Sequence, residues 1–168
     1  AFQVGMASLK DRQAHLKSAA LNHQGGWYES VLNNFPYSLT NAQHKVVEEI
    51  KNDISRTAPM MRLVQGDVGS GKTIVAAIAA AQSIDNNAQV AFMAPTTLLA
   101  EQHFINLQSY FPDYKESIAL LTGSTKAKEK AKIKNGLKSG SIKLVIGTHA
   151  LFQDDVSFLL LGLIVIDE

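Results

Sequence analysis

The stretch Gly66-Asp67-Val68-Gly69-Ser70-Gly71-Lys72-Thr73 decides how the rest of this chain of 168 residues is interpreted. It fits the phosphate-loop pattern G-x-x-x-x-G-K-[ST] at every fixed position. Glycines remove side chains from the turn, so consecutive backbone N–H groups and the start of the next helix can surround a nucleotide phosphate. The Lys72 ammonium then contacts the β- and γ-phosphates, and the Thr73 hydroxyl can bind Mg²⁺. An ordinary glycine turn is the competing interpretation, but the motif and its context agree.

Short apolar runs alternate with helical segments around this loop. The runs are nearly continuous rather than alternating, which is typical of parallel strands that are buried on both faces. We expect strands at residues 61–64, 90–94, 118–121, 142–146 and 163–166, and helices at 72–84, 98–110 and 126–137. This order predicts an α/β fold with a largely parallel sheet and helices on both faces. Ligands of such sheets bind at the carboxyl ends of the strands.

The part of the chain before the loop predicts helices instead. Apolar residues near helical spacing predict a helix over residues 1–24, followed by a short helix over 27–35. A further helix is expected to open at Thr40 and to end between 55 and 59. We therefore divide the chain into a helical lead-in segment, residues 1–34, and an α/β domain, residues 35–168.

The composition excludes several classes of protein. Hydrophobic residues make up 46% of the chain, which is too many for a disordered segment. There is no cysteine, which excludes a disulfide scaffold and cysteine-ligated metal sites. No apolar run approaches the roughly 18–20 residues of a membrane span, and no secretory signal is visible. We expect a cytoplasmic protein without a membrane contact.

The charge distribution is uneven although the net charge is only +1. Residues 122–143 hold seven lysines and one acid, a net charge of +6, so the remainder of the chain sums to −5. The lysines between 126 and 134 are two residues apart, which spreads them around a helix rather than along one stripe. A solvated helix face and a DNA-facing surface both fit this pattern.

An acidic pair follows the last apolar run. Asp167 and Glu168 come directly after residues 163–166, where a phosphate-loop enzyme needs an acid at the end of a second strand. Asp167 is expected to hold Mg²⁺, and Glu168 to position or deprotonate the attacking water. Such a pair is common by itself, and only its combination with the phosphate loop favours catalysis.

Gln43 has two possible roles. Thr40-x-x-Gln43 is a capping box, in which each side chain accepts a hydrogen bond from a backbone N–H at the start of a helix. The same amide can donate and accept at once, which matches the edge of adenine. The two roles compete for one side chain.

Three further strand ends carry small, polar or histidine residues. They suit the phosphates of a polynucleotide, because their backbone N–H groups are accessible. Each stretch by itself also fits a turn or a helix cap. The candidate DNA-contacting residues are Pro95, Thr96, Thr97, Thr122, Gly123, Ser124, Gly147, Thr148 and His149. His103 and His149 lack a partner at metal-ligand spacing, so we expect surface or DNA-contacting histidines.

Taken together, the quoted motifs resemble the first RecA-like motor lobe of the RecG family of superfamily-two DNA helicases. The resemblance covers residues 35–168, and residues 1–34 resemble the helical segment that leads into the motor. It is carried by 35–43, 66–73, 94–103, 122–124, 147–153 and 165–168.

The resemblance implies an ATP- and Mg²⁺-dependent motor that remodels branched or forked DNA in replication-fork rescue and recombination. It implies that Gln43 reads adenine beside an aromatic ring at Phe35 or Tyr37, and it assigns the strand ends to the DNA backbone. It also implies a second RecA-like lobe and a DNA-recognition domain, neither of which we find in this chain, and a monomer. Thr97 stands where the family has glutamate, which changes a cap or a local contact.

Three alternatives remain at this point. The motor lobe of a transcription–repair coupling translocase shares these motifs and accepts Thr96-Thr97. As an isolated lobe, the chain could bind nucleotide with little turnover, because the stabilising arginine of such motors comes from the other lobe. A small-molecule kinase would also use the phosphate loop but leaves the later strand ends unexplained.

Overall fold

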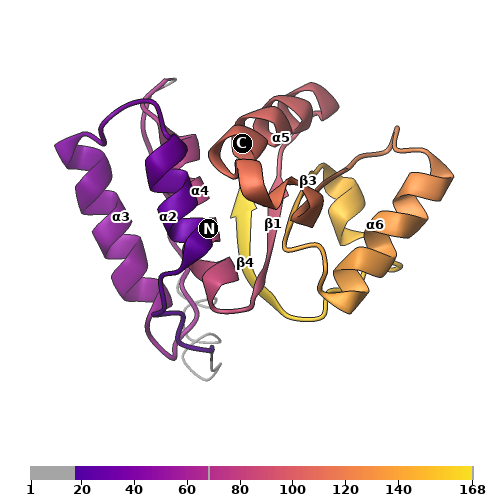
Figure 1. The fold of residues 1–168 in the computed structure, drawn as a ribbon, viewed down its shortest axis with the longest axis horizontal. Helices are drawn as coiled ribbons and strands as arrows, with labels where there is room; N and C mark the ends of the chain where they lie inside the picture. Colours follow the sequence, from indigo (N-terminus) through magenta and orange to yellow (C-terminus); the bar gives the residue numbers. More distant parts are fainter. Residues whose placement is uncertain (1–17, 68, 168) are drawn as a thin grey trace, which may run out of the picture.

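A parallel sheet lies at the centre of the fold, which the computed structural model describes for residues 18–67 and 69–167 (Figure 1). Its strands are β1 (Gln89–Met93), β2 (Ile118–Leu121), β3 (Leu144–Gly147) and β4 (Leu161–Ile166), in the spatial order β2-β3-β1-β4. The helices are α2 (Gly26–Asn34), α3 (Asn41–Ile54), α4 (Lys72–Asp85), α5 (Thr97–Tyr110) and α6 (Ala127–Ser139). Two 3-10 turns, η1 (Pro112–Ser117) and η2 (His149–Phe152), complete the described elements. All strand pairs in the sheet are parallel, so the predicted α/β fold is confirmed.

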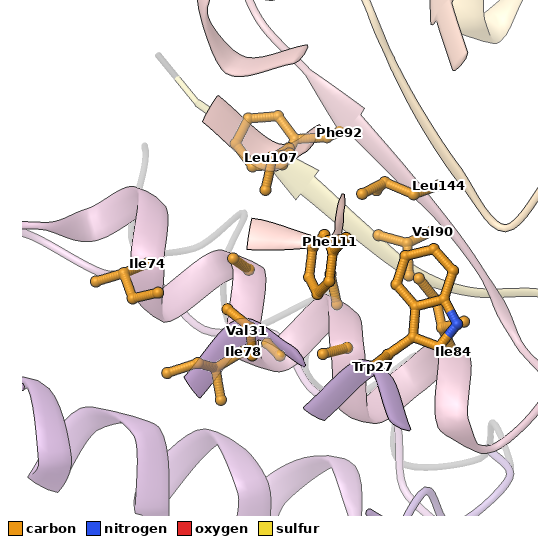
Figure 2. Close-up of a cluster of buried hydrophobic side chains, with 14 of the residues drawn as sticks. Trp27, Val31, Ile74, Ile78, Ile84, Val90, Phe92, Leu107, Phe111 and Leu144 are labelled. Carbon is orange, nitrogen blue, oxygen red and sulfur yellow. The ribbon is translucent and has the colours of Figure 1, made fainter. Parts of the chain in front are cut away.

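Apolar clusters cover both faces of the sheet. Successive strand residues point to opposite faces, and Val90 and Phe92 of β1 belong to a cluster with side chains of α2, α3, α4 and α5. Ala91 and Met93 belong to a second cluster with α6. Figure 2 shows part of the first cluster, which includes Trp27 of α2 and Val90 of β1. The expectation of helices on both faces is therefore confirmed.

Helix α4 follows the phosphate loop and is buried around most of its circumference. It packs against β1 and β4 on one side and against α2 and α3 on the other. Ala77, Ala80 and Ala81 are fully buried, and their small side chains allow the outer helices to approach closely. A helix that is apolar all round needs such enclosure. The start of α4 is thereby held firmly at the carboxyl edge of the sheet.

The carboxylate of Asp85, at the end of α4, ties α2 to this core. It accepts hydrogen bonds from the backbone N–H groups of Gly25 at 2.7 Å, Tyr28 at 2.9 Å and Trp27 at 3.1 Å. These are among the N–H groups at the start of α2 that have no partner within the helix, and the negative charge also suits the helix dipole. Trp27 packs within the core, stacked on Tyr114 with ring centroids 4.3 Å apart, as expected for a packing residue. Since α2 shares this core, the division of the chain at residues 34 and 35 stays a prediction.

The predicted strand at residues 61–64 is wrong. The structure has no strand there, and the Leu63 side chain is 81% exposed. Met60, Leu63 and Val64 line the same cavity as residues 163–166 of β4, so the segment lies near β4 without joining the sheet. An apolar run shows that side chains can be buried, but a strand also needs a hydrogen-bonding partner for its backbone. Within the described chain, β4 pairs only with β1.

The predicted helix over residues 1–24 is also wrong where it can be judged. Residues 18–25 form no regular secondary structure, and the rest of the range lies outside the described residues. Leu21 is buried, but its backbone N–H donates to Ile54 O at 2.9 Å and its carbonyl accepts from Gln82 Nε2 at 2.6 Å. Partners in α3 and α4 thus replace the helical hydrogen bonds.

The remaining predicted elements are confirmed, with ends that shift by one or two residues. These are the strands β1 to β4 and the helices α2 to α6. None of the described helices is both long and apolar enough to cross a membrane.

Candidate active site

The phosphate loop connects the segment beside β4 to the first turn of α4. Gly69 and Gly71 have φ angles of 82° and 81°, in the left-handed region that favours glycine. The Ser70 N–H donates to Asp67 O at 3.1 Å, which closes the turn. The first turn of α4 contains no acidic residue, so the helix itself places no negative charge at the positive end of its dipole, which favours an anion there. Val68 lies outside the described residues.

Lys72 is folded back over this loop. Its Nζ donates to Gly66 O at 2.7 Å and to Asp67 O at 3.0 Å. An ammonium group has three N–H donors, and these two carbonyls use only two of them. The group therefore remains available to an anion in the turn. The Lys72 ammonium therefore lies over the phosphate loop, and its contact with a phosphate stays a prediction.

Gln43 connects the start of α3 to the phosphate loop. Its Oε1 accepts from Thr40 N at 2.8 Å, and Thr40 Oγ1 accepts from Gln43 N at 3.2 Å, so the predicted capping box is confirmed. Gln43 Nε2 donates to Ser70 O at 2.9 Å. Both ends of the amide are therefore engaged within the protein, and adenine recognition stays a prediction. Phe35 contacts Tyr37 and Tyr110 edge-on, with centroids 5.7 and 5.9 Å away.

Asp167 follows β4 at the same edge of the sheet. Its backbone N–H donates to Met93 O at 2.9 Å, and its Oδ2 lies 2.6 Å from His103 Nε2. The interpretation of His103 as a surface or DNA-contacting residue is wrong, because the residue is only 8% exposed and its ring packs on Phe92. Glu168 lies outside the described residues.

A cavity of about 180 Å³ joins these elements. Lys72 and Thr73 line it from the start of α4, and Asp167 lines it from the end of β4. Apolar residues such as Val75, Ala76 and Leu163 form much of the remaining wall. The structure therefore brings Lys72 and Thr73 of the phosphate loop together with Asp167, which belongs to a different motif much later in the chain.

The oxygen atoms of this cavity fit Mg²⁺. A hydroxyl from Thr73 and a carboxylate from Asp167 are hard ligands, and Mg²⁺ usually takes only one or two protein oxygens beside phosphates and water. Among the described residues there is no cluster of three or more His, Cys, Asp or Glu side chains suited to a metal. The site thus suits a cation that arrives with a phosphate ligand.

The predicted DNA-contacting loops lie in register along the carboxyl edge of the sheet. Gly147 of β3 pairs with both Met93 of β1 and Leu121 of β2, and these residues directly precede or begin the three loops. A side chain on Gly147 would clash with the carbonyl oxygen of Leu121, so a glycine is required there. The three loops therefore share one edge of the sheet, beside Asp167.

Several of these residues have structural roles. Thr96 Oγ1 accepts from Leu99 N at 3.3 Å and caps α5, as predicted. Thr122 is only 2% exposed, and its hydroxyl lies 2.9 Å from Ser124 Oγ. Turn and cap interpretations thus hold for both threonines. The exposed members of the set are Pro95, Thr96, Gly123, Ser124 and His149, while Thr97 and Thr148 are half-buried.

The lysine-rich segment coincides with α6. Lys130 donates to Gln153 Oε1 at 2.9 Å, and Lys134 forms an ion pair with Asp155 that lowers the pKa of that carboxyl. These contacts attach α6 to the loop after η2. The exposed lysines of the segment are Lys126, Lys128, Lys132 and Lys138. The solvated and DNA-facing interpretations both remain for those four.

Gln43, the phosphate loop and Asp167 fall within a match to known helicases. The DEAD/DEAH box helicase family matches residues 40–168, which is most of the chain. The chain belongs to the DEAD/DEAH box helicase family. The segment before residue 40 of this DEAD/DEAH box chain, including α2, lies outside the matched range.

Similar proteins point to one branch of the DEAD/DEAH box helicases. The ATP-dependent DNA helicase RecG of Haemophilus influenzae is 43% identical over all of this chain, and the chain covers 24% of it. RecG of Thermotoga maritima is 48% identical over 99% of this chain, and the chain covers 22% of it. A solved structure of RecG bound to a three-way DNA junction superposes with a TM-score of 0.88 at 43% identity, covering 96% of this chain and 22% of that one. The chain thus spans less than a quarter of these relatives, and its resemblance to the RecG family is confirmed.

Proposed function

We propose that this chain is the ATP-binding motor lobe of a DNA helicase that remodels branched or forked DNA. The observation that carries the proposal is the single cavity lined by Lys72, Thr73 and Asp167 at the carboxyl edge of the sheet. Support comes from the relatives, which are named ATP-dependent DNA helicase RecG, and from the RecG structure with a three-way DNA junction. Replication-fork rescue, recombination and a cytoplasmic location belong to the same proposal.

In the proposed reaction, the chain's own residues bind and orient ATP. The backbone N–H groups of residues 66–71 and the start of α4 bind the β- and γ-phosphates. Lys72 exchanges its carbonyl contacts for phosphate oxygens. Thr73 and Asp167 would hold Mg²⁺, which would supply positive charge to neutralise the phosphates. Glu168 positions or deprotonates the attacking water. Gln43, together with the aromatic ring of Phe35 or Tyr37, would bind adenine if its amide released its hydrogen bond to Ser70 or Thr40.

The DNA is proposed to run along the three loops at the carboxyl edge. Thr122 is buried, so in its loop the DNA contact would fall to Gly123 and Ser124, which are both exposed. After β1, Thr96 and Thr97 would supply hydroxyl and backbone N–H groups to the DNA phosphates, while Pro95, which has no N–H group, would contribute only its ring. Gly147 at the end of β3, with Thr148 and His149 after it, would supply the N–H groups of the third loop. If the exposed lysines of α6 contact the same DNA, they would add binding affinity that decreases as the salt concentration rises.

One observation favours a second candidate function, a nucleotide-binding module with little turnover. Arg62 is an arginine of the cavity wall, but its guanidinium is held by Glu49 at 2.7 Å and Asp53 at 2.7 Å. These hydrogen bonds and ion pairs raise its pKa further and keep it from a transferred phosphate. Full turnover would then need an arginine from a second RecA-like lobe. We propose such a lobe and a DNA-recognition domain as partners of this one, in a monomeric motor.

Turnover of Mg-ATP, measured with and without forked DNA, separates the two candidates. Turnover that rises with forked DNA, but not with the same concentration of linear duplex, supports a branched-DNA motor. Nucleotide binding with no turnover on either DNA supports the module. Stimulation that is equal on forked and linear duplex would favour the translocase of transcription–repair coupling and would contradict the specificity for branched DNA.

A further inference from the structure

The carboxylate of Asp167 is held by a histidine from a different element. His103 lies on α5, 64 residues before Asp167, and its Nε2 is 2.6 Å from Asp167 Oδ2. The His103 side chain is 10% exposed and that of Asp167 is 34% exposed. The contact thus joins a buried imidazole to a carboxylate that faces the cavity.

The surroundings of His103 fix the orientation of its ring and determine which ring nitrogen carries the proton. The ring packs on Phe92 with centroids 4.7 Å apart. Its Nδ1 is buried and has no hydrogen-bond partner in the described part of the chain. In the neutral ring the proton therefore belongs on Nε2, where it can be donated to the carboxylate; this tautomer is assigned from the hydrogen-bonding pattern.

The contact with His103 involves only one of the two carboxylate oxygens of Asp167. Oδ2 accepts from His103, and Oδ1 forms no hydrogen bond with any described residue. One oxygen thus anchors the side chain while the other remains for a ligand. An unpaired Nδ1 lowers stability in a buried site, so packing alone is a poor explanation for a histidine at this position.

We propose that His103 is a positioning residue, which holds the Asp167 carboxylate in the orientation that receives Mg²⁺ or a Mg²⁺-bound water. This inference rests on the proposed function, in which Asp167 serves Mg²⁺. Hydrogen-bond partners behind metal ligands typically contribute 10- to 100-fold to metal affinity, because they fix the ligand before the metal arrives.

The test is a Mg²⁺ titration of the affinity for a fluorescent, slowly hydrolysed ATP analogue, with His103→Ala and His103→Gln. We expect His103→Ala to raise the half-saturating Mg²⁺ concentration about 10-fold or more, while affinity without Mg²⁺ stays unchanged. His103→Gln should restore most of the loss, because its amide also donates from a planar N–H group. Adding His103→Ala to Asp167→Asn should cause little further loss, because His103 acts only through the carboxylate that Asp167→Asn has already removed.

The outcomes separate this inference from the proposed function. If the wild-type chain binds the analogue with no dependence on Mg²⁺, both proposals fail. If the wild type depends on Mg²⁺ but His103→Ala does not shift the titration, only the positioning role fails. Two outcomes would show that His103 only supports the fold. One is an equal loss of nucleotide affinity with and without Mg²⁺ in His103→Ala. The other is a His103→Gln variant that needs as much Mg²⁺ as His103→Ala although both have the same melting temperature.

Discussion

Replacing Lys72 with alanine is expected to lower the affinity of the chain for ATP about 10- to 100-fold, because hydrogen bonds to charged groups contribute about 1.5–3 kcal/mol. The reason is specific to its place in the structure. Lys72 is the ammonium group folded over the phosphate loop, where it contacts Gly66 O and Asp67 O. Its removal takes away positive charge but leaves the backbone N–H groups of the turn. The measurement is equilibrium binding of a fluorescent ATP analogue in the presence of Mg²⁺.

Lys45→Ala is the matched control for this prediction. Lys45 is an exposed lysine on α3, the helix that carries Gln43, so the control removes the same charge without touching the loop. We expect its affinity to stay within about twofold of the wild type, because exposed charges are strongly screened in water. Equal losses of affinity in the two variants would show that only net charge matters. An unchanged affinity in Lys72→Ala would show that Lys72 does not contact the nucleotide.

Replacing Phe111 with alanine is expected to lower the free energy of unfolding by about 3–5 kcal/mol. Phe111 is fully buried and lies 4.9 Å from Trp27 between ring centroids, in the cluster shown in Figure 2. The missing ring would leave a cavity where α2, α5 and the sheet meet, and these elements can only partly collapse around it. Domains are typically stable by only about 5–15 kcal/mol, so the loss should be obvious in a urea unfolding curve.

Phe152→Ala is the control for the packing prediction. Phe152 ends η2 and is 48% exposed, so the same atoms are removed from a site that remains half in water. We expect a loss below about 1 kcal/mol, in line with surface substitutions. A loss for Phe111→Ala no larger than that for Phe152→Ala would contradict the packing of α2 and α5 in one core.

The sequence was sufficient for the features that depend on local pattern. The phosphate-loop motif placed the start of α4 at Lys72, and the Thr40-x-x-Gln43 spacing predicted the capping box that the structure shows. Continuous apolar runs predicted the parallel strands, because burial on both faces removes the alternation of a half-exposed sheet. Such features need only the chemistry of neighbouring residues.

Features that depend on distant partners could not be predicted in this way. Residues 61–64 have the composition of a strand, but only the fold shows that β4 pairs with β1 alone in the described chain. Leu21 looks helical until its backbone partners in α3 and α4 are known. His103 was missed as a site residue because its partner is 64 residues away. The one available signal was its position on α5, a helix that begins at the same edge of the sheet as Asp167.

The most direct test is a crystal structure of the chain with Mg²⁺ and a non-hydrolysable ATP analogue. We predict that the phosphates lie within hydrogen-bond distance of the loop N–H groups between residues 69 and 72, with the Lys72 ammonium moved onto them. Mg²⁺ should lie between Thr73 and the carboxylate of Asp167, directly or through water. Phosphates bound elsewhere, or a Lys72 that keeps its contacts to Gly66 O and Asp67 O at full nucleotide occupancy, would contradict the account.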